Sequence, residues 1–562
     1  SLICRTYFAF KFLKDFTFTN NIGIDLNNVR NITFQNKIVG DGVTSAGYSY
    51  RSSNEFKNVT MNQILNYVKN FGRHNITFLA GHETQWVDET YFDGFKRGQN
   101  IVGNIELVNF VNMGGISGQV DAVRREAYLS RVNYGYDTKY FFDLSYRRDG
   151  SSRFSPSKRW GNFFSVGASW NAYKEEFIKN ISALNDLRFR IAYGTVGNDN
   201  LTSYYLYNDL YSLTFNNATE PGVLGSQLGN PNLTWEVGKT FTLGVDFGLF
   251  KNRISGNIEY FQRGSSRLLF DVPRGLSAQL TTLTDNIGTM VNRGVEIQLS
   301  NDIIRTENTK WNLTINFTAL KNEITKLPGG NPITSGTKRL EEGKDLYAFY
   351  LRKWYGVDPT DGAALYKKAD NVTTGYRVTP LGDSVVTNPT NAKFEYVGSA
   401  IPKFFGSINN TFNFKGFFLS TLLNYQVGGK FYDGTYAGLM ALSNSYGKSV
   451  HVDVLKAWKN PGDVTDIPRL DVTSSANFNS QSSRFLIDAS YLNIRNLTFG
   501  YSFPKTIVDK LKIDLLKVFL SGENVKMFSK RKGLNPAESF SGTNSNIYVP
   551  NRVLSFGLNL TF

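Results

Sequence analysis

The stretch Val553-Leu-Ser-Phe-Gly-Leu-Asn-Leu-Thr-Phe562 decides the fold class of this chain. Small or polar side chains stand between its apolar ones, which occupy every second position: Leu554, Phe556, Leu558, Leu560 and Phe562. A period of two residues is the signature of a β-strand with one apolar face. Two classes of protein contain such a strand, the soluble β-sandwich and the β-barrel that spans a membrane.

The same alternation recurs along the chain and favours the barrel. Further alternating segments cover 140–146, 164–170, 187–193, 241–249, 311–319 and 497–503. Strands of sandwiches mostly have five or six residues, whereas a tilted strand needs about nine to cross a bilayer. The polar positions are rich in Gly, Ser, Thr and Asn, which suit a crowded, hydrated lumen. At roughly 25–30 residues per strand and connection, the chain holds on the order of 16–20 strands of an all-β, antiparallel transmembrane barrel.

The composition agrees with strands that face lipid on one side only. The 562 residues include 44 Phe, 30 Tyr, 7 Trp and 51 Gly. The mean hydropathy is −0.29, because only alternate residues of such strands face lipid. No apolar run approaches the roughly 18 residues that a membrane helix requires. A chain of this kind would cross a membrane with strands.

Charge and cysteine content exclude several classes of function. The net charge is +15, but the basic residues are dispersed along the chain, which argues against nucleic-acid binding. A solvated surface and attraction to lipopolysaccharide phosphates remain as explanations of this charge. The single Cys4 excludes a disulfide within the chain. With only three His, no His/Cys metal cluster is expected.

The connections between the alternating segments fall into two kinds. Those at 249–253 and 413–416 are tight, whereas 325–345 and 368–398 are long and polar. Short periplasmic turns and long extracellular loops are typical of outer-membrane barrels. We expect the two long loops to contact a partner or the ligand. A short loop helix is expected over 449–459.

A hexapeptide and the segments after it resemble a known family. The residues are Asp149, Gly150, Ser151, Ser152, Arg153 and Phe154, followed by Trp160 and Gly161. They resemble the signature region of SusC/RagA-like TonB-dependent transporters, the outer-membrane nutrient importers of Bacteroidetes. Matching fragments continue in order at 187–190, 193–194, 197–198, 235–236, 286–288, 294–296, 321–324, 356–359, 401–402 and 492–504. The final Phe562 also resembles the assembly signal of bacterial outer-membrane barrels.

The resemblance implies a fold, a location and a set of partners. The family's barrel has 22 strands, most of which would lie in this chain. A plug domain would fill the lumen, a SusD-like lipoprotein would cover the extracellular side, and TonB would supply force from the periplasm. The substrate would be an oligosaccharide, or second an oligopeptide. Pairs of transporter and lipoprotein would form a dimer in the outer membrane.

Parts of the family pattern are missing from the sequence. The plug domain and the segment that binds TonB do not appear, and 7–14 and 15–26 already resemble barrel strands. Residues 1–562 are therefore expected to be the barrel portion of a transporter, whose partner is a plug-bearing N-terminal segment that is a separate chain, is cleaved off or lies outside this sequence. The rival functions are a passive diffusion porin, a surface adhesin and a soluble β-rich lectin.

The signature residues have mainly structural interpretations. Asp149-Gly150 is a turn dipeptide in which Gly supplies a positive φ. Arg153 and Arg159 are expected to brace a loop, with contact to lipid phosphate as the alternative. Trp160 and Trp170 flank strands, where indole rings prefer the membrane interface, although stacking on a sugar is the sharper alternative.

The sequence offers no enzyme, metal or cofactor site. The adjacent pairs Glu175-Glu176 and Glu341-Glu342 would point to opposite faces of a strand. Asp358 and Asp361 lie near glycines, so Ca²⁺ is conceivable, but the ligand spacing of a calcium loop is missing and a turn is expected. The sequence therefore predicts no catalytic, cofactor-binding or metal-binding residues. The substrate-binding residues cannot be assigned from the sequence.

Overall fold

The computed structural model describes residues 1–562 except 202, 219, 276, 278–279, 442–446, 448, 472–478, 532 and 545–548. Among the described residues, 17 strands belong to one sheet, within the range expected from the sequence. Four small sheets of two to four strands accompany it. Contacts divide the chain into two compact units. Unit 1 comprises Ser1–Asn171, Arg190–Phe241 and Ser265–Gly288, and unit 2 comprises Ala172–Phe189, Thr242–Gly264 and Thr289–Phe562.

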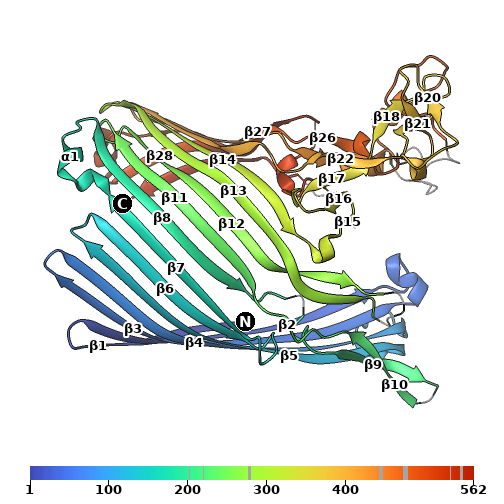
Figure 1. Ribbon diagram of the computed structural model, residues 1–562, viewed down its shortest axis with the longest axis horizontal. Helices are drawn as coiled ribbons and strands as arrows, with labels where there is room; N and C mark the ends of the chain where they lie inside the picture. The colour runs from blue at the N-terminus through green and yellow to red at the C-terminus, as the bar shows by residue number, and fades with distance from the viewer. Residues whose placement is uncertain are drawn as a thin grey trace. The chain divides into compact units, whose positions relative to one another are not determined.

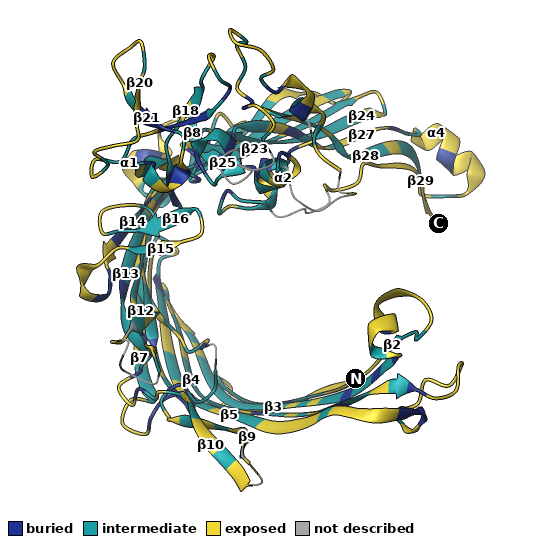
Figure 2. Cartoon of the chain, turned by 90° about the vertical axis from the view of Figure 1, so that its right-hand side faces the viewer, coloured by how far each residue is buried: buried dark blue, intermediate teal, exposed yellow. Residues whose placement is uncertain are grey.

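Unit 1 is built on an antiparallel meander of long strands (Figure 1). Each strand pairs with the next along the chain. The strands are β1 (Leu2–Phe12), β2 (Phe16–Gln35), β3 (Tyr48–Phe71), β4 (His74–Gln99), β5 (Phe110–Tyr136), β6 (Tyr140–Ser151) and β7 (Trp160–Asn171). A separate hairpin of β9 (Leu210–Asn217) and β10 (Glu220–Gln227) is largely exposed (Figure 2). Strands β2 to β5 each have 20 to 27 residues, about twice what a bilayer requires.

Unit 2 contains a second antiparallel meander, which ends with the chain. Its strands pair in the order β13, β14, β23, β24, β27, β28 and β29. They are β14 (Thr309–Lys326), β23 (Phe404–Phe414), β24 (Phe417–Val427), β27 (Tyr491–Ser502), β28 (Leu515–Ser529) and β29 (Val553–Thr561). Strands β8 (Leu184–Asn198), β11 (Glu236–Leu249), β12 (Ile254–Pro273) and β13 (Thr282–Arg305) have residues in both units. Every alternating segment of the sequence is therefore a strand, as predicted.

The two faces of these strands differ as a lipid-facing wall requires. On β6 and β7 the even-numbered Leu144, Phe164 and Val166 are exposed and apolar. On the opposite face the hydroxyls of Ser145 and Ser165 lie 2.6 Å apart. Trp160 and Trp170 lie at the two ends of β7, ten residues or about 33 Å apart along the strand. With the usual tilt this spans about 25 Å, the height of the apolar band of an outer-membrane barrel.

The connections alternate between short and long, as predicted. In unit 1 the turns at 13–15, 72–73 and 137–139 are short. In unit 2 the short turns at 306–308 and 415–416 contrast with long connections at 327–403, 428–490 and 530–552. No helix within the described parts of the chain is long and apolar enough to cross a membrane.

The helices within the described residues are short. The α-helices are α1 (Glu176–Lys179), α2 (Gly434–Leu439) and α4 (Lys505–Val508). The 3₁₀-helices are η1 (Gly40–Ser45), η2 (Leu107–Asn109), η3 (Ala172–Lys174), η4 (Pro328–Gly330), η5 (Pro389–Asn391), η6 (Val452–Lys456), η7 (Ser483–Phe485), η8 (Asp509–Leu511) and η9 (Pro536–Glu538). The loop helix expected over 449–459 is η6, a 3₁₀-helix of five residues.

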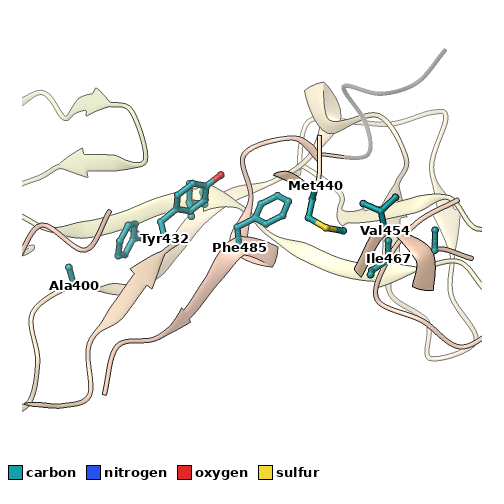
Figure 3. Close-up of a cluster of buried hydrophobic side chains, with 9 residues drawn as sticks. Ala400, Tyr432, Met440, Val454, Ile467 and Phe485 are labelled. Atoms are coloured by element: carbon teal, nitrogen blue, oxygen red, sulfur yellow. The ribbon is translucent and has the colours of Figure 1, made fainter. Parts of the chain in front are cut away.

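The three long connections of unit 2 pack together, and we call them the outer module. Its strands are β15 (Ile333–Ser335), β16 (Lys338–Leu340), β17 (Ala348–Arg352), β18 (Trp354–Val357), β19 (Ala364–Lys367), β20 (Arg377–Val378), β21 (Ser384–Val386), β22 (Phe394–Ser399), β25 (Lys430–Tyr432) and β26 (Leu486–Asp488). Its core draws Phe349 from the first connection and Met440 and Phe485 from the second, all fully buried (Figure 3). Segments predicted as polar loops thus form a folded layer with its own core.

Candidate functional site

The signature residues lie where β6 and β7 meet. Asp149, Gly150 and Ser151 end β6, and Trp160 begins β7. Gly150 is paired on both sides, opposite Glu126 and Trp160, so the prediction that Asp149-Gly150 forms a turn is wrong. A Cβ at Gly150 would lie 3.0 Å from the Trp160 ring, so a larger residue here would require the indole to shift. Strand pairing and the packing of the Trp160 indole, and not the turn propensity of the Asp-Gly dipeptide, determine the backbone conformation here.

Phe154 anchors the connection that follows the signature. It is fully buried, and its ring centre lies 5.4 Å from that of Trp235. Trp235 in turn donates its indole N–H to the carbonyl of Arg159 at 2.9 Å. Arg153 donates to the carbonyl of Asp199 at 2.8 Å, and its guanidinium lies 4.6 Å from the Tyr204 ring centre. Arg153 thus braces the connection.

An ionic network lies on the polar face beside the signature. Asp199 accepts two hydrogen bonds from Arg125, at 2.7 and 3.1 Å, and a third from the Ser151 hydroxyl at 2.7 Å. Arg147 donates to Asp149 at 2.7 Å and to Glu83 at 2.9 Å. Four of these residues, Arg125, Arg147, Asp149 and Asp199, border a cavity of about 400 Å³. Because each arginine faces a carboxylate, the network holds the wall in shape more than it offers charge to a ligand.

A larger cavity, of about 810 Å³, lies in unit 2. It borders β24, β27 and β28 and the segments 533–538 and 549–552, and four of its lining side chains are amides: Asn424, Asn493, Asn524 and Asn535. Glu538, in η9, also lines it, and burial raises the pKa of this carboxyl group. Within the described residues its Oε1 atom is buried without a hydrogen-bond partner. Amide and carboxyl groups converging on a cavity suit a polar organic ligand.

The acidic turn of the outer module is closed by an arginine. Arg377 donates to Asp358 at 2.6 Å and to Asp361 at 3.0 and 2.8 Å. Gly362 has a φ of +72°, and its N–H donates to the Asp358 carbonyl at 2.8 Å. The residues that could have suggested Ca²⁺ therefore form a turn, as expected, whose carboxylates bind a guanidinium.

Other acidic residues are engaged in local structure. Glu341 accepts a hydrogen bond from the Tyr396 hydroxyl at 2.6 Å, and Glu342 accepts one from the Leu327 N–H at 2.9 Å. Glu175 and Glu176 lie at the start of α1. Among the described residues no group of three or more His, Cys, Asp or Glu side chains is arranged to hold a metal ion.

The remaining residues and segments named from the sequence lie at separate places in the described structure. Phe562 directly follows β29 and is 87% exposed. The segment 368–398, and 325–345 from residue 327 on, belong to the first connection of the outer module, whereas 325–326 end β14. The residues that sequence reasoning missed are Glu83, Arg125, Arg147 and Asp199 of the ionic network. Arg147 and Asp149 do share a face by their spacing of two, but Glu83 and Asp199 reach them only through pairing between distant segments.

Comparison with known proteins places these features in a family. A family model described as TonB dependent receptor-like, beta-barrel matches residues 5–525. The TonB-dependent receptor P3 of Formosa agariphila is 27% identical over 99% of this chain and 57% of its own length. The TonB-dependent receptor SusC of Bacteroides thetaiotaomicron is 26% identical over 90% of this chain and 50% of its own. This chain thus spans about half the length of the curated relatives it matches.

A solved structure shares the fold. The RagAB peptide transporter superposes with a TM-score of 0.87 over 100% of this chain and 61% of that chain, at 24% sequence identity. The matches confirm the resemblance drawn from the signature residues. They also confirm the predicted all-β, antiparallel barrel class.

Proposed function

Because this chain belongs to the TonB-dependent receptor-like β-barrel family, we propose that residues 1–562 form the barrel wall of an outer-membrane nutrient importer of the SusC type. The family's proteins lie in the outer membrane and act as receptors and transporters. The cargo of this importer is an oligosaccharide, with an oligopeptide as the second candidate. The protein uses no catalytic residue and no cofactor.

One observation carries the proposal. The family match covers 5–525, and strands in that range such as β6 and β7 have one exposed apolar face and one face of hydrogen-bonded polar side chains. On the polar face Asn21 bonds Asn62 at 2.6 Å, and Asn58 bonds Asp25 at 3.1 Å. Such a polar face supports a hydrated path, because it satisfies its own groups and still presents oxygens and amides to a hydrophilic cargo.

The partners follow from the family and from the length of the chain. A plug-bearing N-terminal segment and TonB are proposed because the relatives are about twice as long as this chain. A SusD-like lipoprotein is proposed as the lid over the outer module, and two transporter–lipoprotein pairs would form a dimer. The folded core of the outer module supports this role, since a preorganised surface binds a partner at lower entropic cost.

The lid proposal is tested with a deletion that spares the module's core. Removing 374–382 takes away β20, its turn and Arg377, but it leaves the buried Tyr366 and Val386 in place; Arg377→Gln, which loosens the same small sheet without removing the segment, is the control. The deletion should lower the amount of lipoprotein that co-purifies with the transporter. Unchanged co-purification and unchanged uptake would remove this segment from the docking surface.

Uptake and conductance separate the importer from its rival, a passive diffusion porin. Cells that lack the chain should lose uptake of the cargo, and wild-type uptake should stop when the proton-motive force is collapsed. The full-length protein should be nearly closed in a planar bilayer. Open channels together with uptake that needs no energy would establish the porin instead.

A further inference from the structure

Four aromatic side chains gather on the polar face of unit 1, away from both cavities. They are Tyr48 and Tyr50 of β3 and Tyr91 and Phe95 of β4, and we call them the aromatic strip. Tyr50 lies opposite Phe95 in the register, and Asn54 lies opposite Tyr91. The Tyr48 and Phe95 ring centres are 5.4 Å apart, and the Tyr50 and Tyr91 hydroxyls are 2.7 Å apart. All four side chains are only partly buried.

Two glycines of β5 lie beneath the Phe95 ring of the strip. A Cβ at Gly114 of β5 would lie 1.9 Å from the Phe95 ring, and one at Gly115 would lie 3.0 Å from it. The ring therefore lies over the backbone of β5, at the point where the register shifts between Phe95 and Lys96. A ring held in this way loses little conformational freedom when a ligand stacks on it.

Small polar side chains flank the strip on both sides. The register places Thr33 of β2 beside Tyr50 and Asn31 beside Ser52. On the other side it places Gln119 of β5 beside Tyr91 and Ser117 beside Asp93. Hydroxyl and amide groups thus border aromatic rings over the seven residues of 48–54, about 20 Å along the strand.

This chemistry matches a sugar chain. A pyranose ring has an apolar C–H face, which can pack on an aromatic ring, and a rim of hydroxyls, which can exchange hydrogen bonds with amides and hydroxyls. The charged side chains on this face within 48–54 and 91–97 are Asp93 and Arg97, one of each sign. A neutral ligand therefore suits the strip better than an anionic or cationic one.

The backbone around the strip rules out peptide binding by strand addition. Extended peptides commonly bind by adding a strand to a free sheet edge. Residues 48–54 of β3 pair with β2 and β4, and 91–97 of β4 pair with β3 and β5. No free edge exists here among the described residues, so recognition must come from side chains alone.

We propose that the aromatic strip is a stacking site for a neutral oligosaccharide. The proposal rests on the importer function and narrows its cargo from two classes to one. Neighbouring sugar units would pack on the Tyr50 and Tyr91 rings, beside Phe95, whose own ring lies 5.2 Å from the Arg97 guanidinium, while their hydroxyls bond Asn31, Thr33, Ser117 and Gln119.

The test uses the full-length protein in detergent on a printed array. The array carries neutral glucan, galactan, mannan and xylan oligosaccharides, together with peptides of four to eight residues that lack charged side chains. Wild type is compared with the double variant Tyr50→Ala/Tyr91→Ala, with Tyr91→Leu and with Tyr91→Phe. Phe92→Ala is the matched control, because Phe92 is 52% exposed on the opposite face of the same strand.

At least one oligosaccharide should bind to the wild-type protein. The double variant should weaken this binding about tenfold or more, Tyr91→Leu should weaken it less, and Tyr91→Phe and Phe92→Ala should preserve it. Tyr91→Leu keeps apolar bulk without a flat ring, so it reports on stacking even if the double variant fails to fold. Gly114→Ala should also weaken binding by displacing Phe95.

Three outcomes would overturn the proposal: no oligosaccharide binds, the variants bind an oligosaccharide as tightly as wild type does, or only peptides bind. In the last case the importer function would stand with a peptide as its cargo. Energy-dependent uptake, measured separately, distinguishes the failure of this site from the failure of the importer.

Discussion

Lys338 holds its ammonium group in an apolar part of the outer module. Its Nζ lies 3.9 Å from the centre of the fully buried Phe349 ring and 5.5 Å from that of Tyr347. The same atom donates a hydrogen bond to the carbonyl of Ser541. The side chain thereby fastens the connection between β28 and β29 to the first connection of the module. Burial lowers the pKa of Lys338 to about 8, from an ordinary value of 10.5.

This lowered pKa predicts a pH-dependent stability. Between pH 8 and 10.5 the unfolded chain keeps the proton on Lys338 and the folded chain loses it, so stability should rise with pH. We expect a gain of about 1 kcal/mol, after allowance for partial exposure. Denaturant midpoints followed by tryptophan fluorescence at pH 7.5 and 10 measure it. The rise should disappear in Lys338→Met and persist in Lys344→Met, which changes an exposed neighbour.

Phe154 shows what a signature residue contributes to stability. Phe154 packs against its core partners and is inaccessible to solvent, so Phe154→Ala leaves a cavity beside Trp235. We expect a loss of about 3–4 kcal/mol. Phe177→Ala, at a residue 70% exposed, should change stability by less than about 0.5 kcal/mol. Thermal unfolding midpoints in detergent compare the two, and equal midpoints would deny Phe154 a structural role.

At the scale of elements, alternation predicted the strands well because it is a local property. The segment 311–319 lies within β14, and 553–562 comprises β29 and the residue that follows it. The great length of β4 and β5 was not predicted, because the second half of β4 and the first half of β5 lack a regular apolar face. The outer module was not predicted either. Phe349, Met440 and Phe485 are buried only when two connections far apart in sequence pack together.

The turn that Arg377 closes decides how firmly β18 to β21 hold together. The hydrogen bond from Arg377 lowers the pKa of Asp361, so its stabilising effect exists at neutral pH and is lost in acid, as pH falls through the lowered value. Arg377→Gln should therefore loosen this small sheet at pH 7. Limited digestion with chymotrypsin should cleave after Tyr376 about five- to thirtyfold faster.

A nearby ion pair provides the control for that digestion. Lys393 also binds a carboxylate, that of Asp370, but the Asp370 side chain is 84% exposed. Exposed pairs contribute little, so Lys393→Gln should leave the cleavage rate near that of wild type. If both variants are cleaved alike, the closed turn does not stabilise the sheet.

At the scale of the whole molecule, the net charge of +15 raises the question of which basic residues contact anionic lipid. On the exposed face of unit 1, the Arg148 guanidinium lies 5.1 Å from the Trp160 ring centre, at one end of the apolar band. The Tyr128 ring lies 6.2 Å from the same indole. An arginine beside interfacial aromatic rings is well placed to meet an anionic lipid headgroup.

Charge reversal at this position tests whether lipopolysaccharide is a partner. Each cation near an anionic membrane surface contributes about 1 kcal/mol, so Arg148→Glu should lower the lipopolysaccharide retained by the purified protein about fivefold. Arg131→Glu makes the same change in charge on the polar face, where Arg131 binds Asp143 at 2.7 Å, and should leave retention unchanged. Native mass spectrometry counts the bound molecules. A specific lipid contact depends on the position of the arginine and not on the total charge of the protein. If wild type, Arg148→Glu and Arg131→Glu retain equal amounts of lipopolysaccharide, Arg148 is part of a solvated surface and binds no lipid.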